Sequence, residues 1–202
     1  MSKPTIGFIG LGLMGGNMVE NLINRGYDLT IMDLNQDVVD GFVAKGAKQA
    51  ASAKELAANA DIVMLALTTS NIVEKVIYAE DGILAGIQSG AVLIDFGTSI
   101  PASTRKIGAD LAAKGVGMLD APLGRTPAHA KDGLLNIMAA GDTETFNKVK
   151  PVLDEQGENV FHLGELGAGH ATKLINNFIG MTTVCAMSQA FAVADKVGID
   201  KQ

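Results

Sequence analysis

The sequence predicts a doubly wound α/β fold, in which a Rossmann-type parallel sheet carries helices on both faces, followed by one long helix. Three observations predict this fold. Short apolar segments alternate with amphipathic ones over most of the chain. The first apolar segment runs into a glycine-rich turn and then a helical stretch. From Gly169 to about Val197 the chain is largely apolar and free of proline, which is typical of one long helix.

The predicted strands are short apolar segments. Strands of this kind are buried on both faces, as in a parallel sheet covered by helices. We expect the first five at Thr5–Ile9, Leu29–Met32, Ile62–Leu67, Ala91–Asp95 and Val116–Leu119. Two further strands are expected at Leu134–Ala140 and Asn159–Leu163.

The predicted helices fall between these strands. Pro101 follows a turn and suits the first position of a helix, where the missing N–H does no harm. We expect helices near Met14–Arg25, Gln36–Lys45, Ala53–Ala60, Ile72–Tyr78, Pro101–Lys114 and Thr143–Glu155.

The long C-terminal helix divides the chain. We expect a Rossmann domain over residues 1–165 and a connecting helix over residues 166–202, which begins an all-helical second domain that is otherwise absent. A helix this apolar needs a surface to pack on. Either the chain is truncated or a partner chain covers the helix, and we expect a homo-oligomer formed through it.

Composition excludes several classes of protein. The formal net charge is −6 and no Lys/Arg cluster occurs, which argues against a nucleic-acid binder. The chain has one cysteine, Cys185, which we interpret as a small core residue in a reducing cytoplasm. No segment has the ~18 uninterrupted apolar residues of a membrane helix, and glycines interrupt the apolar start, which argues against a signal peptide. No two histidines have metal-ligand spacing, so we predict no metal.

The clearest motif is a GxGxxG turn between the first strand and the first helix. Gly10 permits the tight turn, Gly12 lets the backbone approach a pyrophosphate, and Gly15 lets the helix pack closely on the strand. The amino end of the helix offers free N–H groups and the positive end of its dipole to the phosphates. The motif predicts a dinucleotide site.

An acidic residue at the end of the second strand agrees with this site. Asp33 follows Gly15 at roughly the 20-residue distance at which such a residue accepts hydrogen bonds from the ribose hydroxyls. Its carboxylate repels a 2′-phosphate, and no arginine lies beside it. We therefore predict NAD as the cofactor in preference to NADP. The alternative is a glycine-rich packing turn with a solvated aspartate.

A second constellation lies on the long helix. Lys173, Asn176, Asn177 and Gly180 fall on one helical face within an apolar stretch. Burial favours neutral lysine, which makes it a usable proton donor or acceptor near neutral pH. Glycine inside a helix costs about 1 kcal/mol relative to alanine, which close approach of a ligand would explain. A short solvated helix face is the alternative.

Together these motifs resemble the β-hydroxyacid dehydrogenases, the group that includes 3-hydroxyisobutyrate dehydrogenase and tartronate semialdehyde reductase. Four motifs carry the resemblance in order over nearly the whole chain: Gly7–Gly15 for the cofactor, Asp120–Gly124 for the substrate, Gly167–Lys173 for catalysis, and Asn176-Asn177 one turn later.

The resemblance implies hydride transfer between the nicotinamide and the carbinol carbon of a small hydroxy acid. It implies that Lys173 protonates the forming alkoxide, or takes its proton in the reverse direction, and that Asn176 and Asn177 hold the substrate. It also implies a set of residues that line the cofactor, namely Leu13, Met14, Asp33, Leu67 and Thr98. Members of the family continue into an all-helical domain, so we expect this chain by itself to bind NAD yet turn over slowly or not at all.

The substrate motif departs from the family pattern. Many members carry Ser-Gly-Gly where this chain has Gly124-Arg125-Thr126, a variant that resembles sulfolactaldehyde reductase. The guanidinium of Arg125 is a planar fork suited to a carboxylate, sulfonate or phosphate. We therefore expect an anionic substrate at this loop. The alternative is a surface salt bridge, for example with Asp120 or Asp132.

Two functions from different classes remain. The first is an NAD-dependent reductase or dehydrogenase for a small 3-hydroxy acid or its semialdehyde. The second is a dinucleotide-binding module without catalysis, or an inactive NAD-binding fragment. Lys173 favours the first function, because a non-catalytic module has no need of a lysine on that polar stripe.

Overall fold

The predicted parallel sheet is present. The computed structural model describes residues 3–200. Its main sheet has six parallel strands in the order β3-β2-β1-β4-β5-β6. These strands are β1 (Ile6–Ile9), β2 (Leu29–Met32), β3 (Lys48–Gln49), β4 (Ile62–Leu65), β5 (Val92–Asp95) and β6 (Gly117–Asp120). The strand order reverses between β1 and β4, where this fold places its ligands.

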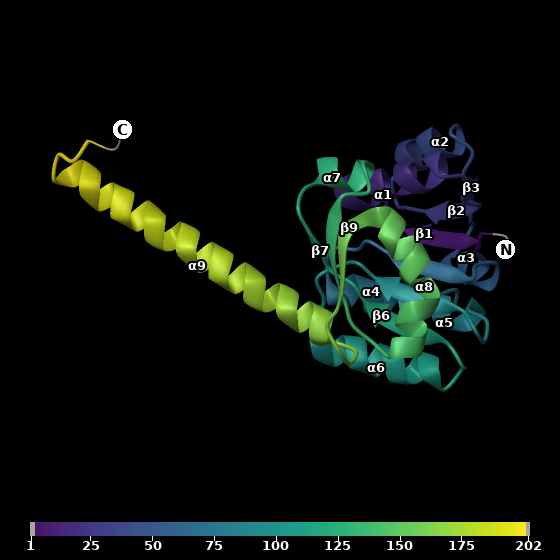
Figure 1. The fold of residues 1–202 in the computed structure, drawn as a ribbon. Coiled ribbons are helices and arrows are strands. Elements are labelled where there is room, and N and C mark those ends of the chain that lie inside the picture. Colours follow the sequence, from purple (N-terminus) through teal and green to yellow (C-terminus); the bar gives the residue numbers. More distant parts are fainter. Residues whose placement is uncertain (1–2, 201–202) are drawn as a thin grey trace.

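Helices connect the strands and cover both faces of the sheet (Figure 1). They are α1 (Leu13–Asn24), α2 (Gln36–Val43), α3 (Ala53–Ala58), α4 (Ser70–Tyr78), α5 (Ile83–Gly86), α6 (Pro101–Ala112), α7 (Pro127–Lys131), α8 (Thr143–Gln156) and α9 (Ala168–Lys196). Pro101 occupies the first turn of α6, as predicted.

Successive residues of the central strands face opposite cores. Phe8 of β1 lies in a core with the buried face of α1 and with α8, whereas Ile9 lies in a second core with α3, α4 and α6. Both residues are buried, which confirms the expectation of a sheet covered on both sides. Gly7 lets α3 approach β1, because an added Cβ there would lie 2.2 Å from Leu56 Cδ2.

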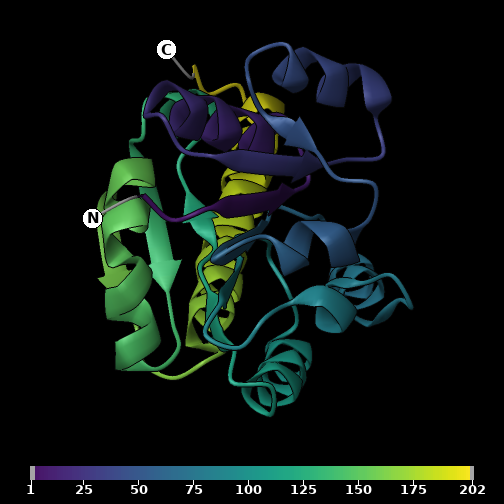
Figure 2. The same cartoon turned by 90° about the vertical axis from the view of Figure 1, so that its right-hand side faces the viewer.

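A second, three-stranded sheet was not predicted. It contains β7 (Leu123–Gly124), β8 (Leu135–Ala139) and β9 (Gly157–His162), with β7 antiparallel and β9 parallel to β8. Figure 2 shows this sheet and α8 along one side of the molecule, with α2 and α3 on the other. The strands β8 and β9 were predicted, but not that they form a sheet separate from the main one. The apolar pattern of a segment predicts a strand and does not indicate which other strand it pairs with.

Four short elements escaped the sequence analysis: β3, α5, α7 and β7. Each has five residues or fewer, too short for a periodic pattern. The boundaries of the longer elements differ from prediction by a few residues. The predicted strand over Ile62–Leu67, for example, ends at Leu65, after which the chain turns towards the glycine motif.

The long helix leaves the domain. Figure 1 shows α9 projecting from the side opposite the amino terminus, and only Gly169 and His170 of this helix are buried. The prediction that Cys185 is a core residue is therefore wrong: the thiol is exposed, because within residues 3–200 no other element packs against this part of α9.

The exposed part of α9 is rich in apolar side chains. Those with at least half of their surface exposed are Ile175, Phe178, Ile179, Met181, Val184, Met187, Phe191 and Val193. By length and composition alone α9 could cross a membrane, with a mean hydropathy of 1.2 over its most apolar window. One such helix is weak evidence, and Asn176 and Asn177 lie on it.

Candidate dinucleotide and substrate site

The glycine turn lies at the carboxyl end of β1, next to the point where the strand order reverses. Gly10 has a φ of 97°, a left-handed conformation that favours glycine. An added Cβ at Gly10 would lie 2.5 Å from the carbonyl oxygen of Ala66, and one at Gly15 would lie 1.9 Å from that of Gly10. The fold therefore requires glycine at both positions, for the tight turn and for close packing of α1.

Gly12 differs from these two glycines. Its φ is −65°, which any residue adopts, and an added Cβ would meet no atom within 4 Å. Neither backbone strain nor packing within the described residues explains a glycine here. Close approach of a ligand does explain it, because a pyrophosphate contacts the backbone at this point of the motif.

The amino end of α1 has no side-chain cap. Gly12 is the N-cap, and residues 13–16 carry no acidic side chain in the first turn. The N–H groups of this turn and the positive end of the helix dipole are therefore available to an anion. Leu13 is 81% exposed and Met14 is partly buried, so both predicted cofactor residues border this open space.

Asp33 follows β2 and contacts the glycine turn directly. One carboxylate oxygen accepts a hydrogen bond of 2.6 Å from the backbone N–H of Leu11, and the other accepts one of 2.9 Å from Asn35. The structure therefore places Asp33, the residue predicted to bind the ribose, against the glycine turn that is predicted to bind the phosphates. The side chain is bound to the turn rather than simply solvated, which argues against the alternative of a solvated aspartate.

The two remaining predicted cofactor residues follow the next two strands. Leu67 follows β4, and its Cδ2 atom would lie 3.1 Å from a Cβ added at Gly10. Thr98 follows β5 and is next to Gly97, where an added Cβ would lie 2.7 Å from the carbonyl oxygen of Leu67. Both residues are partly buried. The carboxyl ends of β1, β4 and β5 thus form one continuous edge.

The predicted substrate loop follows β6. After Asp120, the chain enters β7, in which Gly124 packs against Asn136 of β8. Arg125 has a φ of 76° and is the one described residue other than glycine with positive φ. A left-handed conformation favours glycine, so the backbone at this position is strained for an arginine. Thr126 is the N-cap of α7, and its hydroxyl lies 2.7 Å from His129 Nδ1.

The guanidinium of Arg125 has partners within the chain. It forms an ion pair with Glu158 of β9, and it donates a hydrogen bond of 2.7 Å to the carbonyl oxygen of Leu134. A salt bridge was the alternative interpretation of this arginine, but its partner is neither Asp120 nor Asp132. Two donors of the fork are occupied, which leaves others for a ligand.

Lys173 lies near the amino end of α9, three residues after the buried His170. It is partly buried, and burial lowers the pKa of its ammonium group below the ordinary value. This is the direction expected of a lysine that donates or accepts a proton near neutral pH. Lys173 is bonded neither to Arg125 nor to the two asparagines within residues 3–200.

The rest of the predicted polar stripe is exposed. Asn176, Asn177 and Gly180 lie on the part of α9 that projects from the domain. An added Cβ at Gly180 would meet nothing within 4 Å, so packing within the described residues does not account for this glycine. These three assignments remain predictions.

A buried polar cluster near Lys173 was missed by sequence reasoning. Asp95 ends β5, Asp120 ends β6, and both carboxyl groups surround the imidazole of His170. His170 is fully buried, so its imidazole is not open to a ligand. The signal was present in the sequence, because both aspartates end apolar strands whose carboxyl ends meet at one edge.

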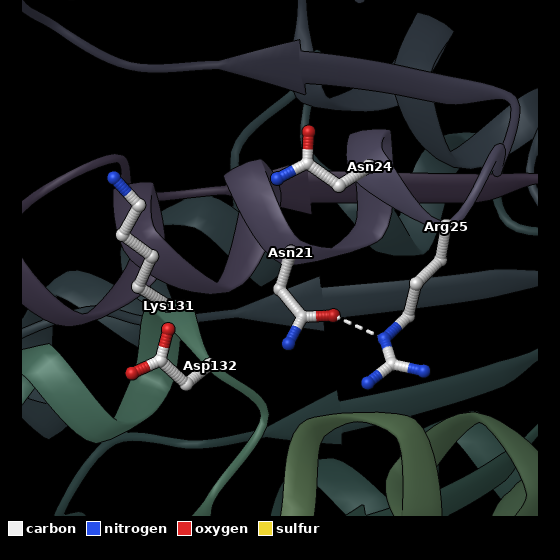
Figure 3. Close-up of a pocket in the computed structure, with 5 residues that line it drawn as sticks. All are labelled: Asn21, Asn24, Arg25, Lys131 and Asp132. Atoms are coloured by element: carbon white, nitrogen blue, oxygen red, sulfur yellow. Dashed lines mark hydrogen bonds between the residues drawn. The ribbon is translucent and has the colours of Figure 1, made fainter.

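The other polar features lie elsewhere. His162 ends β9, where its ring stacks on Phe146 with 4.4 Å between the ring centroids and its Nε2 atom lies 2.8 Å from the carbonyl oxygen of Gly141, so its contacts are structural. A hollow of about 240 Å³, shown in Figure 3, lies at the carboxyl end of α1, away from the glycine turn. It is lined by Asn21, Asn24, Arg25, Lys131 and Asp132, none of which was predicted to bind ligand. We assign no function to it.

These features define the class of protein. A glycine turn at the switch point, an uncapped helix end and an acidic residue after β2 are the parts of a dinucleotide-binding Rossmann domain. The family follows from comparison with known proteins. The family described as the NAD binding domain of 6-phosphogluconate dehydrogenase matches residues 5–164, and the chain belongs to it.

Similar proteins confirm the resemblance to β-hydroxyacid dehydrogenases. The chain is 40% identical over 195 residues to an NAD-dependent L-serine dehydrogenase of Pseudomonas aeruginosa, and 34% identical over 194 residues to a 3-sulfolactaldehyde reductase of Escherichia coli. Each match covers 96% of this chain and 65% of the relative, so the chain spans less than two thirds of their length.

Solved structures agree with this relationship. A 3-hydroxyisobutyrate dehydrogenase of Mycobacterium tuberculosis with L-serine superposes with a TM-score of 0.92 at 31% identity. The match covers 99% of this chain and 68% of that one. The long helix α9 therefore belongs to the shared architecture as well.

Proposed function

We propose that the chain binds NAD(H) and forms the cofactor-binding and proton-transferring part of an oxidoreductase for a small 3-hydroxy acid or its semialdehyde. One observation carries the proposal. Gly12 is a glycine that neither the backbone conformation nor the packing of the described residues requires, at the uncapped amino end of α1. A bound pyrophosphate would explain the glycine at this position, because it contacts the backbone at this point of the motif.

Each residue of the proposed cofactor site has a separate role. Gly10 and Gly15 shape the turn, Gly12 admits the phosphates, and Asp33 accepts hydrogen bonds from the ribose hydroxyls. Asp33 also disfavours a 2′-phosphate by charge repulsion, which supports NAD over NADP. Leu13, Met14, Leu67 and Thr98 complete the lining.

The proposed chemistry needs one proton to move at the substrate oxygen. When bound, NADH would supply the hydride for reduction and NAD⁺ would accept it in oxidation. Lys173 donates the proton when the carbonyl is reduced and removes it when the alcohol is oxidised, and its lowered pKa supports both roles. Arg125, Gly124 and Thr126 of the substrate loop bind the acid group, while Asn176, Asn177 and Gly180 line the side of α9.

The substrate we propose is a small anion. The relatives named above act on serine and on sulfolactaldehyde, according to their names. Arg125 supports a carboxylate or sulfonate, because its planar fork matches either group. Glu158 competes for the same guanidinium, so the substrate must share or displace that ion pair.

The test replaces Gly12 with alanine. The new Cβ faces open space, so the fold should persist, while NADH affinity should fall at least tenfold in a fluorescence titration. Gly41→Ala is the matched control, because a Cβ there also meets nothing within 4 Å and Gly41 lies on α2, outside the site. Equal NADH affinity in wild type and Gly12→Ala would remove the cofactor from this turn.

A second function is supported by the exposure of α9. Asn176 and Asn177 are exposed among the described residues, which supports a chain that binds the nucleotide without completing a closed active site. In that case the protein is a dinucleotide-binding module. A substrate panel with NADH and NADPH separates the two functions, because only the first consumes reduced nucleotide.

We further propose two structural units, residues 1–165 and 166–202, and a homo-oligomer formed through α9. The apolar side chains that α9 exposes support the oligomer, since a second copy would remove them from water. The cytoplasm remains the proposed location, on the evidence of a single cysteine.

A further inference from the structure

The amino end of α9 is capped by a side chain from another element. Its own N-cap, Gly167, offers no side chain. Instead, the carboxylate of Asp120 accepts hydrogen bonds from the backbone N–H groups of Gly167, at 2.7 Å, and His170, at 2.6 Å. These are the N-cap and N3 positions, the same two N–H groups that a capping box satisfies. One carboxylate at the end of β6 therefore holds the first turn of the helix that carries Lys173.

Asp120 is itself held firmly. Its backbone N–H and carbonyl oxygen exchange two hydrogen bonds with Ala140, at 3.1 and 2.8 Å. The first turn of α9 packs closely against the backbone of β6 and β8. A Cβ added at Gly169 would lie 2.4 Å from the carbonyl oxygen of Met138 and 2.8 Å from that of Asp120. Only glycine permits this approach, so the position of the first turn of α9 is fixed on two sides.

The imidazole of His170 extends the connection to β5 and α6. Its Nδ1 atom lies 2.8 Å from the hydroxyl of Thr104 on α6. Its Nε2 atom is buried, has no hydrogen-bond partner in the described part of the chain, and lies 3.7 Å from a carboxylate oxygen of Asp95. A fully buried polar group of this kind is costly to disturb, because each broken contact leaves another group unsatisfied.

Asp95 in turn shapes the loop on the cofactor side. Its carboxylate accepts hydrogen bonds from the N–H of Gly97, at 2.8 Å, and from the hydroxyl of Ser99, at 2.9 Å. Thr98, a proposed cofactor contact, lies between these two residues. Burial raises the pKa of the Asp95 carboxyl group, as expected for a carboxyl without water around it.

We propose that Asp120 and His170 are positioning residues for Lys173, which fix the first turn of α9 against the ends of β5 and β6 that carry the cofactor and substrate loops. The inference rests on the proposed role of Lys173. Lys173 follows His170 by three residues, less than one helical turn, so a shift of the imidazole moves the lysine with it. Neither positioning residue needs to touch ligand, since both are fully buried.

The first test uses the unaltered chain. Amide hydrogen exchange without nucleotide should show the amides of Gly167 and His170 protected at least tenfold more than those of Gly12 and Gly15, which hold the same two positions in the first turn of α1, where the N-cap makes no side-chain hydrogen bond. Equal or weaker protection at the two amides would overturn the proposal, whatever the enzyme activity of the chain.

The second test uses two variants. Thr104→Val removes the partner of His170 Nδ1 with little change in shape, and Asp120→Asn replaces one of the two acceptor oxygens by an N–H donor. Both should speed exchange at residues 167–173 at least tenfold. Both should also raise the pKa of Lys173 towards its ordinary value, measured by NMR of ¹³C-labelled lysine, because the looser turn admits water to the ammonium group.

The matched control is Tyr78→Phe. It also removes a hydroxyl that bonds α6, but on the outer face of that helix, where it contacts Asp110 and Lys106. Exchange at residues 167–173 and the pKa of Lys173 should stay as in wild type. If Asp120→Asn does not fold, Thr104→Val decides the matter: a folded Thr104→Val protein with unchanged exchange and unchanged lysine pKa contradicts the proposal.

The proposed function and this inference can fail separately. In Thr104→Val, NADH affinity should stay within twofold of wild type, because the glycine turn is not altered. A wild-type chain that binds no NADH refutes the proposed function but leaves the exchange and lysine measurements valid. Where turnover is measurable, kcat of Thr104→Val should fall at least fivefold with KM for the substrate unchanged, since Lys173 is displaced while the substrate loop is intact.

Discussion

The carboxylate of Asp33 accepts a hydrogen bond from the backbone N–H of Leu11 at 2.6 Å, so the residue that we propose selects the cofactor also holds the turn that we propose binds its phosphates. The two roles depend on one side chain. A change of Asp33 therefore alters both the ribose contact and the geometry of the glycine turn. Exchanging this aspartate should not simply convert an NAD site into an NADP site.

Asp33→Ala should weaken the binding of both nucleotides. Loss of the bond to Leu11 leaves a backbone N–H without its partner, and a hydrogen bond to a charged group contributes roughly 1.5–3 kcal/mol. We expect NADH affinity to fall at least tenfold, with no gain for NADPH above its wild-type value. Fluorescence titration measures both. Asp61→Ala is the control, because Asp61 anchors the backbone of Thr5 at the start of β1, away from the glycine turn.

Lys173→Met should separate cofactor binding from chemistry. A positioned proton donor or acceptor contributes about 10²- to 10⁴-fold to a rate, so turnover of a semialdehyde should fall by that factor. NADH affinity should stay within twofold, because the glycine turn is unchanged. Lys54→Met, on α3, is the control and should leave turnover unchanged. Turnover equal to wild type in Lys173→Met would exclude this lysine from catalysis.

The same variant should stabilise the protein at neutral pH. Burial lowers the pKa of Lys173 in the folded state, so between that value and the ordinary 10.5 the unfolded chain binds more protons than the folded chain. Stability of the wild type therefore rises with pH through this window. Lys173→Met removes the penalty, so its Tm should exceed that of the wild type at pH 7, and the difference should shrink near pH 10.5.

Much of the fold followed from local patterns. Every strand of the main sheet except β3 was predicted, because both faces of the sheet are buried, which gives uninterrupted apolar segments such as Ile62–Leu65. The helices α1 to α4, α6 and α8 were predicted between the strands. The second sheet was not predicted. Its pairing depends on which strand lies next to β8, a long-range choice that no local pattern records.

Those residues of the candidate site whose type is required by the backbone or by their place at a strand end could be predicted from the sequence. Gly10 and Gly15 are required by contacts that a Cβ would break, and Asp33 stands at the end of a strand. The partners of Arg125 and His170 were not predictable. Glu158 and Thr104 lie far from them in the sequence, and only the packing of α7, β9 and α6 brings each pair together.

The N-cap of α8 provides a test of pH dependence. Asp142 accepts a hydrogen bond of 2.8 Å from the N–H of Thr145. The Thr145 side chain first, and this N–H second, hold the pKa of the Asp142 carboxyl below its usual range by hydrogen bonding. A lowered pKa in the folded state means that the stabilisation is present above the unfolded pKa and is lost as the pH falls through the folded one. Asp142→Ala should therefore cost about 1 kcal/mol at pH 7 and progressively less in acid.

Urea unfolding at neutral and acidic pH measures this difference. Ser52→Ala is the matched control, because Ser52 caps α3 through the N–H of Glu55 with a hydroxyl that does not titrate. Its cost should be the same at both pH values. A cost of Asp142→Ala that does not change with pH would show that its charge does not contribute to capping.

The exposed face of α9 predicts self-association. Phe178 and Phe191 are 71% and 50% exposed, and a second copy of the helix would bury them. Replacing both by glutamate should convert an oligomer into a monomer in light scattering, without loss of NADH affinity. Ser188→Glu, on the same helix, is the control for added charge. A wild-type chain that is monomeric at high concentration would contradict the proposed oligomer.

Substitutions of Arg125 and Glu158 should have opposite effects on the affinity for an anionic substrate. Arg125→Gly removes the guanidinium while keeping the left-handed backbone, which glycine adopts without strain. KM for an anionic substrate should rise at least tenfold, because a charge-assisted hydrogen bond contributes about 1.5–3 kcal/mol. Glu158→Gln frees the guanidinium from its ion pair, so KM should fall.

An uncharged aldehyde is the internal control for this pair of variants. Its KM should be unaffected by both substitutions, because it has no group for the guanidinium to bind. If instead Arg125→Gly leaves KM for the anion unchanged, Arg125 is a structural residue whose ion pair with Glu158 ties the loop to β9. Loss of folding stability with unchanged KM would be the signature of that role, since the substitution removes both the ion pair and the bond to Leu134.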